Sequence, residues 1–379
     1  MKAEFDNKVY VVGADHHTTL SVTRCLSHYG CDVHLVIHGT SNIKASKLAH
    51  TNSVQSVVGF EEDEDLLINW LCQRKHDKKA FIIPTSDYAA LIIDKNAERL
   101  NEFYLPGFRG EPGKMAMLMD KFEQKKYADM HGVPMAQSWA LEQNADIPVD
   151  IKYPCIVKPL RSAYGSKSSI FVAQDKAELQ DGLERMAGPV IIQQYLKKTH
   201  ELCAYGVMEN KNPNYRGGLI RKIHESENGS TVYAETIEYN EFSEKVCNML
   251  WEDGYRGLYD FEILVCEDGL YLNEINFRNS GNGYALEAHG IPAALIWCNS
   301  VLGISNSLFA VSMKPGLRHI NDYFEIVNIK RLKLGLFEVI RNIVSAHGRA
   351  IWDWHDLRGS VAFYKPLINN VAKKLLRKG

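Results

Sequence analysis

Two glutamates and an asparagine between Gly257 and Gly283 offer the hard oxygen ligands that a divalent cation prefers. Glu262 and Glu274 lie twelve residues apart, and 267–269 (Glu-Asp-Gly) reads as a three-residue hairpin loop between two strands. This loop predicts that Glu262 lies opposite Glu274, with Asn276 on the same face because side chains alternate along a strand. Carboxylates in an apolar setting favour a bound cation, so we expect Mg²⁺, or alternatively Mn²⁺, held against substrate phosphates. The alternative is an exposed hairpin whose glutamates are solvated.

A second candidate is a basic loop between two apolar strands. PCIVKP places Lys158 in a strand, and the loop 161–167 and the strand SSIFVA follow. The loop residues that we expect to contact phosphates through the backbone are Ser162, Gly165 and Ser166. This is not a Walker loop, because it lacks GxxxxGK[ST] and no helix follows it. A flexible surface hairpin has the same composition.

Composition restricts the class of protein. The 379 residues are 45% hydrophobic and 24% charged with a net charge of −2, which gives no basic balance for nucleic acid. The eight cysteines are scattered without a CxxC, so we expect a reduced, cytoplasmic protein. We expect neither a signal peptide nor a transmembrane helix. For the basic segment 365–378 we favour a solvated amphipathic helix over a membrane contact.

The elements that position these residues fall into two patterns. Up to about residue 105, buried strands alternate with helices, which predicts an α/β domain with a parallel sheet. Its first turn, GADHHTT, lacks the GxGxxG of dinucleotide-binding folds, and we expect His16 and His17 to be loop residues that point apart. The polar segment 85–87 ends a buried strand, where it could bind a ligand or cap a helix.

From residue 153 the chain alternates helices with antiparallel strands, an α+β pattern. An amphipathic helical stretch over 114–131, closed by Gly132, connects the two patterns. We therefore predict an N-terminal α/β domain over 1–112 and an α+β domain over 113–315. Within the second, 153–197 forms a small lid subdomain, and 316–379 is an extension that completes the domain.

Taken together, the order IVKP…G…QQYL…E…FEIL…EIN.R resembles the ATP-grasp superfamily of ATP-dependent carboxylate ligases. The resemblance implies an N-terminal pre-ATP-grasp domain and roles for individual residues. Lys121 and Lys158 would contact ATP phosphates, and 161–167 would close over them. Gln193 would read the adenine amino group, although family members usually carry Glu there, and the backbone up to Tyr195 and Leu196 would bind the purine edge.

The resemblance also implies the remaining ligands. Glu201 would bind the ribose, Glu262, Glu274 and Asn276 would hold Mg²⁺, and Arg278 would steady the transferred phosphate. Asp260 competes with Glu262 as the first metal ligand, and the spacing to Glu274 favours Glu262.

The implied activity joins a small-molecule carboxylate to an amine through an acylphosphate, with release of ADP and phosphate. The chain is most similar to the group near carbamoyl-phosphate synthase large subunits and D-aspartate ligases, in which homodimers are common. It departs from them at 279–285 (NSGNGYA), which we expect to border the acceptor. Arg221, with Lys222 and His224, could bind an acceptor carboxylate or lie on a solvated strand edge. The alternatives are an inactive nucleotide-binding regulatory module and an ATP-grasp enzyme with a non-amine acceptor.

Overall fold

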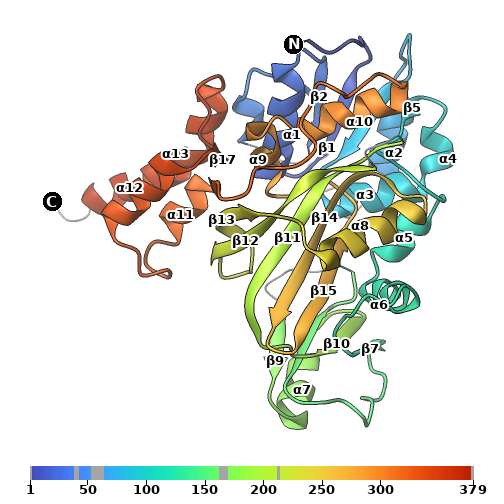
Figure 1. Cartoon of the computed structure of the whole chain (residues 1–379), viewed down its shortest axis with the longest axis vertical. Helices are drawn as coiled ribbons and strands as arrows, with labels where there is room; N and C mark the ends of the chain where they lie inside the picture. Colours follow the sequence, from blue (N-terminus) through green and yellow to red (C-terminus); the bar gives the residue numbers. More distant parts are fainter. Residues whose placement is uncertain (1, 38–41, 53–63, 162–169, 211–213, 377–379) are drawn as a thin grey trace.

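The computed structural model describes residues 2–37, 42–52, 64–161, 170–210 and 214–376, with side chains to residue 369. In these residues the strands form three sheets, which lie one after another along the long axis of the molecule (Figure 1). No helix in the described ranges combines the length and the apolar character that crossing a bilayer needs.

The N-terminal sheet is parallel throughout, as predicted, and its order is β3-β2-β1-β4-β5. The central strands are buried because helices cover them. Its strands are β1 (Val9–Gly13), β2 (Val33–Ile37), β3 (His50–Asn52), β4 (Ala80–Pro84) and β5 (Tyr104–Leu105). Its helices are α1 (His17–His28), η1 (Ile43–Ala45), α2 (Glu64–Cys72), α3 (Asp87–Lys95) and α4 (Ala97–Leu100). The strand predicted at 53–59 lies outside the described residues.

A four-stranded sheet follows, with the order β7-β10-β8-β9 and antiparallel pairing. It has its own small core around Cys155, Val157 and Ile192. Its elements are β7 (Ser138–Leu141), β8 (Cys155–Pro159), β9 (Phe171–Ala173), α7 (Lys176–Leu183) and β10 (Val190–Gln194).

The largest sheet has eight strands in the order β15-β14-β11-β12-β13-β16-β17, with β6 paired to β14. Its long central strands are antiparallel, which confirms the predicted α+β class. The strands are β6 (Phe108–Arg109), β11 (Lys198–Met208), β12 (Tyr215–Glu225), β13 (Thr231–Ile237), β14 (Arg256–Cys266), β15 (Gly269–Asn276), β16 (Arg318–Ile320) and β17 (Gly348–Arg349). The helices are α8 (Glu241–Glu252), α9 (Gly283–Ala288) and α10 (Ala293–Leu302).

The stretch predicted to be helical over 114–131 is helical, but it is interrupted. The segment forms α5 (Lys114–Leu118) and α6 (Lys121–Met130). Asp120 separates them because its backbone is extended and its carboxylate accepts hydrogen bonds from the N–H groups of Phe122 and Glu123. This break places Lys121 in the first turn of α6, where its N–H donates to Leu160 O at 3.0 Å.

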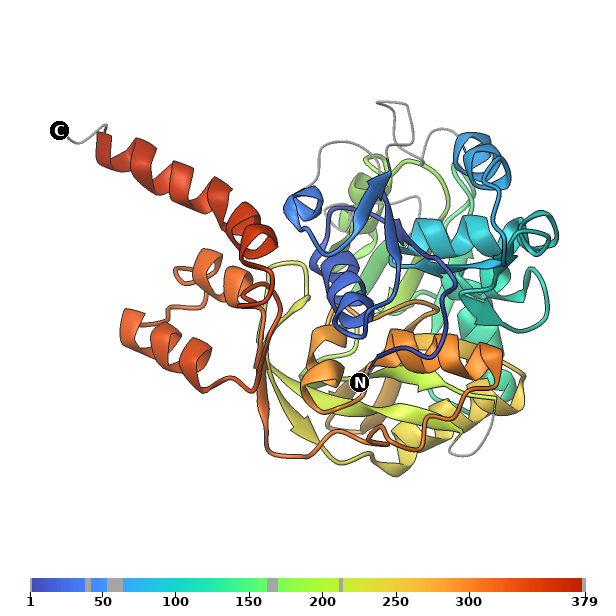
Figure 2. The ribbon, with the colours of Figure 1, turned by 90° about the horizontal axis from the view of Figure 1, so that it is seen from above.

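The C-terminal segment contains α11 (Asp322–Val327), α12 (Leu336–Ser345) and α13 (Leu357–Leu376). In both views α13 extends away from the sheets (Figures 1 and 2). The segment is anchored to α1 by buried Arg24, whose guanidinium donates to Asp356 Oδ2 at 3.1 Å and to Ile351 O at 2.9 Å. A charged side chain buried in this way has its donors paired, so the anchor is specific.

Candidate active site

The hairpin of β14 and β15 places Glu262 directly opposite Glu274, and Asp260 opposite Asn276. The predicted pairing of the two glutamates is therefore confirmed. The predicted three-residue loop is wrong, because Gly269 pairs with Cys266 and leaves a two-residue turn. Gly269 has a φ of +153°, which a glycine adopts without strain.

A β-bulge at Asn273 was not predicted. Glu262 faces Glu274 while Ile263 faces Leu272, so Asn273 is the extra residue in β15. Its side-chain amide donates to Glu262 Oε2 at 3.0 Å, and its oxygen accepts from Lys158 Nζ at 3.1 Å. Two consecutive polar residues, Asn273 and Glu274, were the available signal in an otherwise alternating strand.

Three lysines surround the two glutamates. Lys121 Nζ lies 3.1 Å from Glu274 Oε1, and Lys222 Nζ lies 3.2 Å from Glu262 Oε1 and also pairs with Glu201. Burial disfavours the charge on Lys222, but the Glu262 and Glu201 carboxylates outweigh it and raise its pKa. Burial lowers the pKa of Lys158, an effect that Glu274 partly offsets. The site is therefore a compact cluster of opposite charges.

A cavity of about 750 Å³ lies between the four-stranded sheet and the large sheet. Its lining joins Ile156 and Lys158 of β8 and the two glutamines of β10 to charged residues of β11, β14 and β15. The residues that line it include Ile156, Lys158, Gln193, Tyr195, Leu196, Glu201, Glu262, Leu264, Asn273 and Glu274. Its size and its mixture of apolar and polar walls suit a nucleotide.

A second cavity, of about 520 Å³, lies between the large sheet and the carboxyl ends of β1 and β4. Its lining is mostly polar. It includes Asp15, His16, His17, Thr18, Thr85, Ser86, Asp87, Lys121, Cys203, Asp260, Glu262, Glu274, Asn276, Arg278, Asn282 and Phe324. Glu262 and Glu274 line both cavities, so the two cavities meet at the paired carboxylates.

Comparison with known proteins identifies this region. Residues 126–291 match the ATP-grasp domain family. The chain contains an ATP-grasp domain. The predicted resemblance to the ATP-grasp superfamily is thereby confirmed over a segment that includes Glu262 and Glu274, the two carboxylates that line both cavities.

One curated relative and two solved structures illustrate the range of proteins to which this chain is similar. The chain is 25% identical over 237 residues to a formate-dependent phosphoribosylglycinamide formyltransferase from Sulfolobus acidocaldarius. The matched region is 55% of this chain, and it spans 58% of the length of that relative. The fold is similar to N5-carboxyaminoimidazole synthetase from Staphylococcus aureus complexed with ADP, with a TM-score of 0.64, 16% identity and coverage of 88% and 87% of the two chains. An L-amino acid ligase from Bacillus licheniformis has a TM-score of 0.64, 15% identity and coverage of 84% and 79%.

Five of the predicted nucleotide residues line the larger cavity, namely Lys158, Gln193, Tyr195, Leu196 and Glu201, whereas Lys121 lines the smaller one. Gln193 is buried, and its amide nitrogen donates to Ser138 Oγ at 2.9 Å, which leaves the amide oxygen as the acceptor for a ligand. The N–H of Tyr195 donates to Pro154 O at 3.0 Å, so that group is already used. Glu201 is buried and pairs with Lys198 at 2.7 Å and with Lys222. The loop residues Ser162, Gly165 and Ser166 lie outside the described residues.

Arg278 lies in the smaller cavity beside two carboxylates. Its guanidinium lies 2.6 Å from Asp87 Oδ1 and 3.7 Å from Asp260 Oδ2. Burial opposes its charge, but Asp87 outweighs burial and raises the pKa of Arg278. Burial also raises the pKa of Asp260, which Arg278 partly offsets. Of the two alternatives for 85–87, helix capping is confirmed, because the Ser86 side chain accepts a hydrogen bond from Ala89 N. The segment also lines the cavity, and ligand binding there stays a prediction.

The structure does not bring Arg221 into the site. Its side chain is half exposed and pairs with Glu235 at 2.9 Å, whereas the next residue, Lys222, lies in the charge cluster. The two side chains lie on opposite faces of β12 because a strand alternates. Its predicted neighbour His224 pairs with Glu325 at 3.1 Å. The expectation that His16 and His17 point apart is also wrong, since they occupy the irregular start of α1 with ring centroids 3.9 Å apart.

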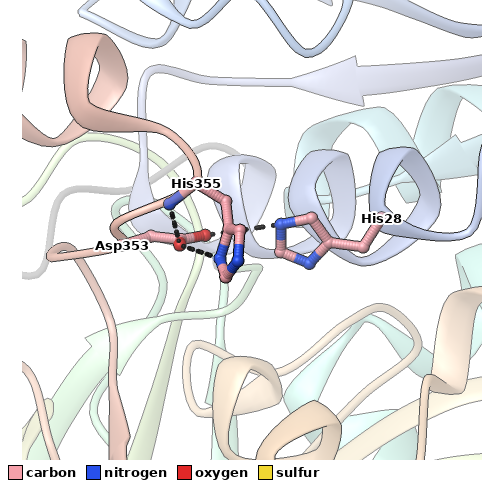
Figure 3. A group of neighbouring side chains, drawn as sticks. All are labelled: His28, Asp353 and His355. Atoms are coloured by element: carbon pink, nitrogen blue, oxygen red, sulfur yellow. Dashed lines mark hydrogen bonds and ion pairs between the residues drawn. The ribbon is translucent and has the colours of Figure 1, made fainter.

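A separate group joins α1 to the C-terminal segment (Figure 3). Its members are His28, Asp353 and His355, and one ring nitrogen of each histidine and a carboxylate oxygen of Asp353 lie within 4.8 Å of one another. His28 Nδ1 lies 2.9 Å from Glu287 Oε1, and its Nε2 lies 3.5 Å from Asp353 Oδ2. Asp353 and Glu287 raise the pKa of His28 to about 10, so both nitrogens carry protons at neutral pH. The group is therefore an ion-pair clamp outside the two cavities.

Proposed function

We propose that this chain is an ATP- and Mg²⁺-dependent ligase that activates a carboxylate and joins it to an amine, with release of ADP and phosphate. The observation that best supports this proposal is the meeting of two cavities at Glu262 and Glu274. A nucleotide in the larger cavity and an acceptor in the polar cavity would have their reacting ends at the same wall. The S. acidocaldarius relative is named as formate-dependent, and formate is a carboxylate.

In the first step, a carboxylate oxygen of the substrate attacks the terminal phosphorus of ATP and the bond to ADP breaks, which gives an acylphosphate. Lys121 and Lys158 would neutralise phosphate charge, and Arg278 would offset the repulsion between the two anions. The carboxylates of Glu262 and Glu274 and the amide oxygen of Asn276 offer the hard oxygen ligands that Mg²⁺ prefers and would hold it there. A bound Mg²⁺ would supply charge neutralisation for the phosphates.

In the second step, the amine attacks the acyl carbon, loses a proton and displaces phosphate. The polar walls of the smaller cavity, among them Asn282, Thr85 and Asp260, would orient the acceptor. Enclosure of this cavity would also keep water from the acylphosphate.

The test is ADP release measured with ATP, Mg²⁺ and pairs of small carboxylates and amines. We expect release that needs both organic substrates. ADP release that continues over many turnovers with a carboxylate but without an amine would indicate a non-amine acceptor, because formation of the acylphosphate alone stops after the first turnover. Nucleotide binding with no release across the panel would instead favour a regulatory module.

We further propose a reduced compartment, the cytoplasm, because the eight cysteines are free thiols. The homodimer stays a prediction, and light scattering with mass determination tests it.

A further inference from the structure

Helix α12 exposes a continuous apolar stripe, here called the C-terminal stripe. It consists of Leu336, Phe337, Ile340 and Val344, which are 70%, 79%, 51% and 70% exposed. Leu336, Ile340 and Val344 follow one another at successive turns, and Phe337 lies beside them, so the four share one face. Large apolar side chains grouped in this way mark an interaction surface, whereas scattered single ones do not.

The opposite face of α12 is already packed. Val339 and Asn342 are buried, and Asn342 Nδ2 donates to Glu325 Oε1 in α11 at 2.8 Å. The helix is therefore held in its orientation by contacts on its inner face. The stripe on the outer face follows from that orientation.

Basic side chains border the stripe. Lys330, Arg331 and Lys333 are exposed just before α12, and Arg341 is exposed on the helix itself. Glu338 is the one acidic residue between 327 and 345, and it lies 3.8 Å from Arg341. The whole chain has a net charge of −2, so this positive charge is a local concentration next to apolar side chains.

The segment that leads into α13, and α13 itself, also carry exposed apolar side chains. Trp354, Leu357, Val361 and Ile368 are exposed large apolar residues on the segment that leaves the body of the molecule (Figure 2). Tryptophan is favoured where one side meets hydrocarbon and the other meets water. Exposed large apolar side chains therefore occur on this segment as well as on α12.

We propose that the C-terminal stripe docks on an anionic membrane surface. The four apolar side chains would enter the interfacial layer while Lys330, Arg331 and Lys333 contact lipid phosphates. With ten residues, α12 is too short to cross a bilayer, so it would lie along the surface. A symmetric contact with a second copy of the chain fits less well, because it would bring the same basic residues against one another.

The test is co-sedimentation of the full-length protein with vesicles of phosphatidylcholine alone or mixed equally with phosphatidylglycerol. We expect binding to the anionic vesicles that weakens at high salt. Phe337→Ser should lower the partition coefficient by about tenfold or more, because the aromatic side chain that would enter the membrane interface is lost. Replacing Lys330, Arg331 and Lys333 together with Gln should remove the preference for anionic lipid.

Leu308→Ser is the matched control, since Leu308 is 77% exposed but lies outside the C-terminal segment. It should bind as the unaltered protein does, and thermal unfolding should show that each variant is folded. Equal or absent binding to the two kinds of vesicle would overturn the proposal. So would self-association in solution that Phe337→Ser abolishes, because the stripe would then be a contact between copies.

Discussion

Lys222 Nζ lies 3.2 Å from Glu262 Oε1 and also pairs with Glu201, and the lysine side chain is almost wholly buried. The lysine thus connects the predicted ribose ligand to the predicted metal ligand before any substrate binds. Removing it would leave two carboxylates close together with little solvent.

We therefore expect Lys222→Met to lower the free energy of unfolding by about 3 kcal/mol, as urea denaturation measures it. Adding Glu262→Gln should restore part of the loss, because one unpaired charge is removed. Lys245→Met, at an exposed lysine that donates to Gly132 O, is the control. A loss in Lys222→Met no larger than in this control would contradict the assigned ion-pair cluster.

Glu274→Ala and Lys158→Ala should abolish the rise in melting temperature that ATP with Mg²⁺ produces. Ligand present at about 100 times its Kd stabilises the native state by about 2.7 kcal/mol, which is easily detected. Glu123→Ala, at a surface residue paired with Lys126, should keep the full shift. No shift in the unaltered protein would refute the nucleotide site.

Gln193→Leu should weaken ATP binding by about tenfold, because one hydrogen bond to the adenine amino group is lost. GTP has an oxygen in place of that amino group, so its weak binding should change little. Competition with a fluorescent ATP analogue measures both. Equal losses for ATP and GTP would indicate that Gln193 serves packing rather than base recognition.

His17→Ala should raise the KM for the acceptor by about tenfold while the KM for ATP stays unchanged, since His17 lines only the smaller cavity. Burial, with the neighbouring His16, lowers the pKa of His17 well below its usual value. It is therefore neutral at pH 7 and above, and its removal should leave the pH profile in that range unchanged. His131→Ala is the control, and a rise in the KM for ATP alone would contradict the assignment.

His28→Gln should destabilise the chain by about 1–2 kcal/mol at neutral pH, less than full burial would give because the clamp is partly exposed. Asp353 and Glu287 raise the pKa of His28 from 6.5 to about 10. Its contribution is therefore complete below pH 6.5 and is lost as the pH rises toward 10. Urea denaturation across this range should show the two proteins converging at high pH, and a constant difference would contradict the clamp.

The site could be predicted where its residues lie close in sequence on one element. Glu262 and Glu274 are such a pair, because a hairpin and the alternation of a strand determine their positions. Lys222 could not be assigned, since its partners lie 21 and 40 positions away and only the pairing of β11, β12 and β14 brings them together. Residue type does not distinguish Arg221 from Lys222, because both are basic. Only the alternation of side chains along β12 shows that Lys222, and not Arg221, faces the site.

The fold classes could be predicted from the alternation of strands and helices, but local interruptions of those elements could not. Asp120 ends α5 because its carboxylate caps α6, although the apolar spacing runs on through 114–131. The bulge at Asn273 likewise depends on tertiary pairing and not on residue type. Such features need the partner strand or helix to be known.

The smaller cavity is lined in part by the loops after β1 and β4, which belong to a different sheet from the strand that carries Gln193. Substitutions in those loops can alter the acceptor without disturbing the residues around the nucleotide. Divergence between descendants of one ancestral chain could therefore proceed at 14–18 and 85–87 while the paired glutamates stay constant. Evolution of a new specificity would then require a few changes in short connections rather than a rebuilt core.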